Sequence, residues 1–152
     1  MLEILIGASI ITASFLGVLT VFDRLLQSSR SMVELSQATA LLEEGLEVGR
    51  IFRDQSWINL ADWSTGTNYY LTWSGGKWAT TTVNTFIDGK FERKISLTDV
   101  NRDDTTKDIV PPAGGGGTLD PNTKLVTVSV AWSDAGATTT KTLSTYLTNL
   151  FN

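Results

Sequence analysis

The hydrophobic residues of this chain follow three successive patterns, of which the first is an uninterrupted run. From Ile4 to Phe22 there are 19 consecutive uncharged residues, and their apolar side chains keep to no single helical face. At 1.5 Å per residue a helix of this length is roughly 28 Å long, close to the roughly 30 Å hydrocarbon core of a bilayer. The run therefore predicts a helix surrounded on all sides by lipid or by other helices.

Between Asp23 and Asp54 the pattern becomes amphipathic. Apolar residues recur at intervals made up of three- and four-residue steps, which places them on one part of the helix surface, and the charged residues lie on another part. The recurring apolar positions are Leu25, Met32, Leu35, Leu42, Leu46 and Phe52. Because no proline occurs before Pro111, nothing obliges the helix to end at a membrane boundary. We expect one continuous helix over residues 2 to about 54, too long for one small domain to bury and therefore shared with other subunits.

Residues 55–152 change to a period of two, which is typical of strands. Segments 69–73 and 77–82 flank Ser74-Gly75-Gly76, a hairpin signal. Further strands are expected at 91–100 and 124–132, and residues 138–150 can return antiparallel to the latter across 133–137. The faces predicted to be buried are Phe91, Arg93, Ile95 and Leu97 on one strand and Val126, Val128, Val130 and Trp132 on another. The aperiodic stretch 101–122, with Pro111-Pro112 and glycines at 114–117, predicts a surface loop.

These patterns predict an α+β fold in two parts. Residues 1–54 form the N-terminal helix, with 1–22 as a transmembrane or filament-core segment and 23–54 as its amphipathic half. Residues 55–152 form a globular antiparallel β domain. Short connections favour an antiparallel sheet with one covered face, and the amphipathic half of the helix is the available cover.

Composition removes most catalytic chemistry. The chain contains no histidine and no cysteine, which excludes imidazole bases, thiolate nucleophiles and the usual zinc ligands. The net charge of -4 argues against a broad electrostatic contact with nucleic acid. We predict no enzyme and no catalytic residue. The five Trp are read as core and interface anchors, with a sugar-stacking face as the alternative.

Small residues are frequent within the apolar run. Gly7, Ala13 and Gly17 allow helices to approach closely, as packed membrane helices do. Together with Ile4 and Ile11, they are predicted to pack in the core of an assembly. A simple single-pass lipid anchor is the alternative.

Glu3 is the only charged side chain before Asp23. Its place in the first turn suits the positive end of the helix dipole. One interpretation leaves it solvated among lipid headgroups. The other buries it in an assembly, where a cation has to neutralise it, and the nearest candidate is the α-amine of Met1 on the same or a neighbouring chain.

Two stretches resemble a known family. The start, MLEILIGASIITASFLG, is similar to the N-terminal signature of type IV pilins and pseudopilins, and ALLEEGLEVGRIFRD resembles the amphipathic half of bacterial pilin helices. The resemblance covers residues 1–54. It implies a pilin-like fold, cleavage by a prepilin peptidase, methylation of the new N-terminus, and pairing of Glu3 with the N-terminal amine of a neighbouring subunit.

The resemblance also implies a location and partners. The chain would reside in the inner membrane, and the pilus assembly machinery would polymerise identical subunits into an extracellular helical filament at the cell surface. Adhesion and motility are functions of such filaments. A pseudopilin of a type II secretion or DNA-uptake system is the alternative within the family. A membrane-anchored binding or adhesion module is the alternative from another class.

One acidic cluster is a candidate metal site. Oxygen-bearing side chains alternate like the start of a calcium loop, at Asp99, Asn101, Asp103, Asp104 and Asp108. The sixth position is Asp104, where a calcium loop requires glycine, and the twelfth is Val110 in place of glutamate. Calcium and a solvated acidic turn are therefore both left open, and no other cofactor is expected.

Overall fold

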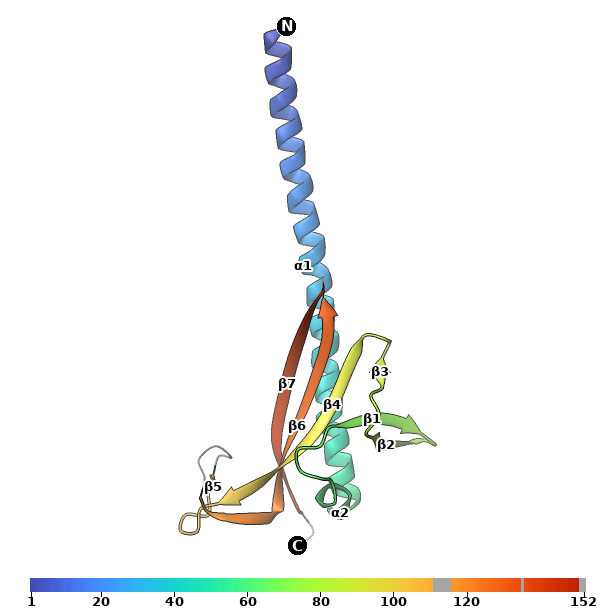
Figure 1. The fold of residues 1–152 in the computed structure, drawn as a ribbon, viewed down its shortest axis with the longest axis vertical. Helices are drawn as coiled ribbons and strands as arrows, with labels where there is room; N and C mark the ends of the chain where they lie inside the picture. Colours follow the sequence, from blue (N-terminus) through green and yellow to red (C-terminus); the bar gives the residue numbers. More distant parts are fainter. Residues whose placement is uncertain (111–115, 135, 151–152) are drawn as a thin grey trace. The chain divides into compact units, whose positions relative to one another are not determined.

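The computed structural model describes residues 1–110, 116–134 and 136–150, and its elements are drawn in Figure 1. In chain order these are α1 (Leu2–Gln55), α2 (Ile58–Ala61), β1 (Tyr69–Ser74), β2 (Lys77–Thr81), β3 (Phe86–Ile87), β4 (Phe91–Arg102), β5 (Ile109–Val110), β6 (Thr118–Asp134) and β7 (Ala137–Thr148). The long helix predicted over residues 2 to about 54 is confirmed, and so is the α+β class.

The chain separates into two compact units, Met1–Gln37 and Ala38–Asn152. The division falls inside α1 and not at the predicted boundary of 54/55. Its physical reason is that the last third of α1 packs on the sheet and belongs to the second unit.

Strands β1 to β7 form one antiparallel sheet in the second unit. The order along the sheet is β2-β1-β4-β6-β7, and β3 and β5 also pair with β4. The predicted hairpin is confirmed, since Ser74 pairs with Lys77 across Gly75 and Gly76. These two glycines have φ of 60° and 77°, the positive values that a two-residue hairpin turn matching the sheet twist requires.

The core of the second unit lies between one face of this sheet and residues 38–52 of α1. Alternate residues of β4 and β6 are buried, as the two-residue period predicts. The helix contributes Ala38, Leu42, Leu46, Val48 and Phe52, and the sheet contributes chiefly Phe91, Ile95, Leu97, Val126, Val128, Val130 and Trp132. Both predicted buried faces are confirmed, including the buried Arg93.

The predicted apolar stripe of the amphipathic half is only partly covered. Leu42, Leu46 and Phe52 are buried, whereas Leu25, Met32 and Leu35 are exposed. Within the second unit, the cover of the sheet is therefore supplied by residues 38–52 of the predicted amphipathic half.

The predicted loop over 101–122 is also wrong at both ends. Strand β4 continues through Arg102, and β6 already begins at Thr118. The register shifts from Asp99↔Lys124 to Val100↔Asp120, so β6 bulges over residues 121–123. Pro121 has no N–H to donate to a ladder, and a bulge is where a sheet tolerates it. Pro111, Pro112 and Gly114 of the predicted loop lie outside the described residues.

Candidate functional site: an uncovered apolar helix

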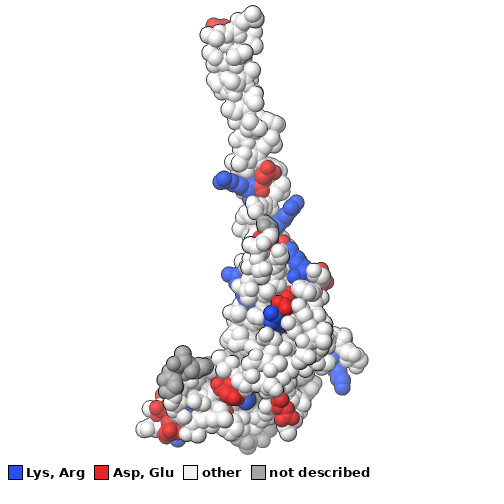
Figure 2. All heavy atoms as spheres, in the orientation of Figure 1, with Lys and Arg blue, Asp and Glu red and all other residues white. Residues whose placement is uncertain are grey.

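The side chains of residues 4–22 form a continuous apolar surface in the first unit. Ile4 is 77% exposed and Phe15 is 63% exposed, and the other large apolar residues of the run are exposed as well. Figure 2 shows no charged side chain on the visible face of this stretch. Soluble monomers rarely expose apolar patches beyond a few hundred Å². This surface therefore requires lipid or another protein surface to cover it.

Helix α1 is long and apolar enough to cross a membrane, by length and composition. Its apolar part carries hydroxyls that bond within the helix. Ser9 donates to the Ile6 carbonyl at 2.8 Å, Thr12 to Ala8 at 2.8 Å and Thr20 to Leu16 at 2.9 Å. An apolar environment offers no water to hydroxyl groups, so these bonds fit the segment for lipid or for a helix bundle.

No packing contact within the described chain requires a small residue at these positions of the apolar run. A Cβ built at Gly7 or at Gly17 would meet nothing within 4 Å. Ala13 and Ile11 are exposed as well. Small size at these positions leaves room for the close approach of a second helix.

Met1 and Glu3 are exposed at the N-terminal end of this surface. Glu3 lies in the first turn of α1, and the Leu5 N–H donates to the Met1 carbonyl at 3.3 Å. Among the described residues neither the Met1 amine nor the Glu3 carboxylate has an ion-pair partner. Both charges are therefore available to a group outside the subunit.

The calcium candidates do not converge. Over the described ranges, no group of three or more acidic, histidine or cysteine side chains is placed to hold a metal ion. Asp99 binds the Lys124 ammonium and accepts a hydrogen bond from Thr65 at 3.0 Å. The bond from Lys124, helped by Thr65, holds the pKa of Asp99 below its usual value. This carboxylate is therefore stabilised as an anion without a metal.

The other four candidates also bond to protein groups, Asp108 through its backbone. Asp103 caps its own turn by accepting the N–H groups of Thr105 and Thr106 at 2.7 and 2.8 Å, which lowers its pKa. Asp104 accepts from Thr118 at 2.6 Å. The Asn101 amide donates to the Gly116 carbonyl at 3.0 Å, and the backbone carbonyl of Asp108 accepts from Asp103 at 2.9 Å. These contacts favour the acidic turn over a calcium site.

Sequence reasoning missed the group that organises this region, which is Arg102. Its guanidinium bonds Asp120 at 2.6 Å, the Lys107 carbonyl at 2.9 Å and the Thr123 hydroxyl at 3.2 Å. Burial raises the pKa of Asp120, but the bonds from Thr123 and Arg102 outweigh it and the net shift is downward. Nothing in the local sequence signals these pairs, because the partners are brought together by the bulge in β6.

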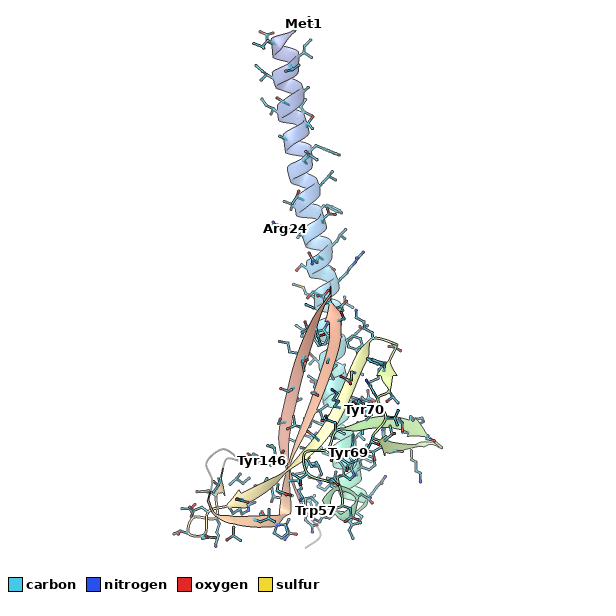
Figure 3. The ribbon with its side chains drawn as sticks, in the orientation of Figure 1. Met1, Arg24, Trp57, Tyr69, Tyr70 and Tyr146 are labelled. Carbon is cyan, nitrogen blue, oxygen red and sulfur yellow. The ribbon has the colours of Figure 1, made fainter. Side chains whose placement is uncertain are left out.

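The aromatic residues act mainly as core anchors. Trp132 is buried with Phe91 at 5.9 Å between ring centroids, and Trp63 packs between Phe52 and Tyr69 at 5.7 and 4.6 Å. The Trp57 indole donates to the Pro121 carbonyl at 3.3 Å, and Figure 3 labels its side chain and that of Tyr69. Trp73 remains largely exposed, in edge contact with Trp78 at 5.3 Å. The geometry favours the core interpretation over a sugar-stacking face.

Comparison with protein-family models, with curated proteins and with solved structures finds no match. The functional interpretation therefore depends on the molecule itself, and its most prominent unsatisfied surface is the apolar helix of the first unit.

Proposed function

We propose that this chain is a structural subunit of the type IV pilin class that polymerises through its N-terminal helix into a filament. The observation that carries the proposal is the uncovered apolar surface of residues 4–22. A subunit with such a surface changes one apolar environment for another on assembly, lipid before and neighbouring helices after. The uncharged run, the small residues and the internally bonded hydroxyls all suit both environments.

The filament follows from how such helices associate. Contacts between copies that are head-to-tail and do not close generate an open helical fibre. The apolar helices would form the fibre core, and the sheet domains of residues 38–152 would form its surface. Gly7, Ala13 and Gly17 would sit where neighbouring helices approach most closely, with Ile4 and Ile11 filling the spaces between them.

Glu3 sets the axial register in this proposal. A carboxylate buried among helices costs several kcal/mol unless it is paired. The N-terminal amine of a neighbouring subunit supplies the cation, and pairing is possible only where the two ends meet. The family resemblance adds a leader peptidase, N-terminal methylation and an assembly machinery in the inner membrane.

The direct test is electron microscopy of material sheared from cells, combined with the intact mass of the subunit. Long fibres of this chain alone support the pilin proposal, whereas short multi-component assemblies favour the pseudopilin alternative. The mass identifies the mature N-terminus and its methylation.

Substituting Glu3 tests the register. Glu3→Ala should abolish fibres while the chain still enters the membrane fraction, since the apolar run is unchanged. Asp62→Ala removes an exposed carboxylate of the second unit and is the matched control. A normal fibre yield from Glu3→Ala would contradict the pairing.

The length of α1 also fits a membrane-anchored binding or adhesion module. In that case the helix stays in lipid. Subunits would be extracted from cells by detergent as monomers, and shearing would release none of them.

A further inference from the structure

A groove in the second unit runs along α1 beside the edge strand β7. It has a volume of about 530 Å³ and is lined by Ala40, Glu43, Glu44, Glu47, Arg50, Leu143 and the buried Leu46. Strand β7 is an edge strand of the sheet. Its residue Leu143 is 39% exposed. The groove therefore combines apolar contact surface with three glutamates and one arginine.

One carboxylate of this groove is uncompensated. Glu44 pairs with the buried Arg93 at 3.1 Å, and Glu47 pairs with Arg50 at 2.9 Å. Glu43 is exposed and has no ion-pair partner among the described residues. A cation with apolar neighbours is the complement of this surface.

The first unit carries such a cation at Arg24, whose side chain Figure 3 labels. Arg24 is exposed and has no ion-pair partner in the described chain. At about 100° per residue, Met32 and Leu35 fall within a quarter turn of Arg24, and Met32 is 68% exposed. The acidic residues of the segment 23–37, Asp23 and Glu34, lie about 100° and 80° around the helix from Arg24, on the side away from Met32.

Arg30 differs in its surroundings. It lies about 120° around the helix from Arg24. Asp23 and Glu34 are seven residues before and four residues after it, which places both carboxylates on its own face. Arg24 is therefore farther around the helix from both carboxylates than Arg30 is, and Leu35 lies about 20° from Arg24.

We propose that the groove receives the Arg24 face of a second copy of this chain, with the Arg24 guanidinium against the Glu43 carboxylate. The inference deepens the proposed filament function and rests on it. Opposite charge and matching apolar surface support this occupant, and so does continuity, because Arg24 lies two residues after the end of the apolar run proposed as the filament core. An exposed ion pair adds little affinity, so its role is to fix which surface meets the groove.

Cysteine crosslinking tests this contact, because the chain has no cysteine of its own. Positions 24 and 43 are separated by about 28 Å along one helix, far beyond the roughly 7 Å that a disulfide spans between Cα atoms. Any disulfide in the variant Arg24→Cys/Glu43→Cys therefore joins two copies. Mild oxidation, or a short bis-maleimide linker for thiols held apart by the reach of an Arg–Glu pair, should give a ladder of covalent multimers from its fibres.

Two matched variants are the controls. Arg30→Cys/Glu43→Cys moves one thiol about 120° around the helix, and Arg24→Cys/Asp62→Cys moves the other out of the groove. The ladder should be at least tenfold stronger for the 24/43 pair than for either control. Fibres that form without a 24/43 ladder, or with equal ladders from the 30/43 pair, overturn the groove contact and leave the filament proposal standing.

Charge reversal provides a second, independent readout. Arg24→Glu and Glu43→Arg should each lower fibre yield at least tenfold, and the double variant Arg24→Glu/Glu43→Arg should restore it. Asp62→Arg should have no effect. Undiminished fibres from both single reversals overturn the pairing, whereas an absence of fibres from the unsubstituted chain overturns the proposed function and this inference together.

Discussion

Two buried glycines on the same face of α1 should respond oppositely to the same substitution. A Cβ added at Gly45 would lie 2.7 Å from Cγ1 and 3.2 Å from Cγ2 of Val128. A Cβ added at Gly49 would lie 3.6 Å from its nearest neighbours, on Ile95 and Val126, which is ordinary van der Waals contact. The pair isolates close packing from helix propensity.

The magnitudes follow from these distances. Replacing a glycine inside a helix by alanine gains about 0.5–1 kcal/mol from backbone propensity. Gly49→Ala should therefore stabilise the second unit by about 1 kcal/mol. At Gly45 the clash outweighs this gain, because Val128 is fully buried and a β-branched side chain has little rotameric freedom. Overpacking costs about 1–3 kcal/mol, so Gly45→Ala should destabilise by about 1 kcal/mol net.

Urea unfolding of the detergent-solubilised full chain measures both effects. Tryptophan fluorescence reports only the second unit, since all five Trp lie after residue 54. Val128→Ala removes the clashing methyls, so a double-mutant cycle with Gly45→Ala should show a favourable coupling of about 1 kcal/mol. The reasoning is refuted if Gly45→Ala is as stable as Gly49→Ala, or if the cycle shows no coupling.

Two further predictions concern the buried assembly and acid stability. Ile11→Lys should abolish fibres, because a lone ammonium in a helix bundle is uncompensated. Fibre yield is measured by fluorescence or electron microscopy of sheared material, and a normal yield would place Ile11 outside the core. Asp99 has a folded pKa below its unfolded value of about 3.9, so its contribution to stability is complete above that pH and disappears as the pH falls through the folded value. Asp99→Asn should therefore flatten the fall in unfolding free energy between about pH 5 and pH 2, and an unchanged slope would show that Lys124 does not stabilise the anion.

The parts of the fold that were predicted from the sequence are those with a local period. The alternation of Ile95 and Leu97, and of Val126 and Val128, specifies which face of each strand is buried, and the structure follows it. Gly75-Gly76 specifies the hairpin because few other residues adopt positive φ at both turn positions. The uncharged run specifies the first part of α1.

The features that were not predicted depend on residues far apart in sequence. The apolar stripe of α1 continues through Leu35 and Leu42 without interruption, yet only the latter is buried, because the extent of the sheet decides where cover begins. The spacing of Asp99 and Asp104 resembles a metal loop, whereas Lys124 and Thr118, brought there by β6, bind their carboxylates. The hydrophobic period of a segment indicates which face of a strand or helix is buried. It does not indicate which groups the polar side chains bind.

The candidate assembly surface lies between these cases. Its apolar character is readable from residues 4–22, and the structure adds that Gly7 and Gly17 have open space around them. The molecule that covers that surface depends on the assembled state. Neither the hydrophobic period nor the structure of one subunit describes that state.

The most direct test of the central claim is photocrosslinking from position 11 in material sheared from the cell surface. A photoreactive amino acid at Ile11 joins whatever lies against the apolar helix, and mass spectrometry identifies the adduct. The proposed filament predicts adducts of twice the subunit mass, joined within residues 4–22 of a second copy. Adducts with phospholipid alone would contradict it and would assign the helix to the membrane as an anchor.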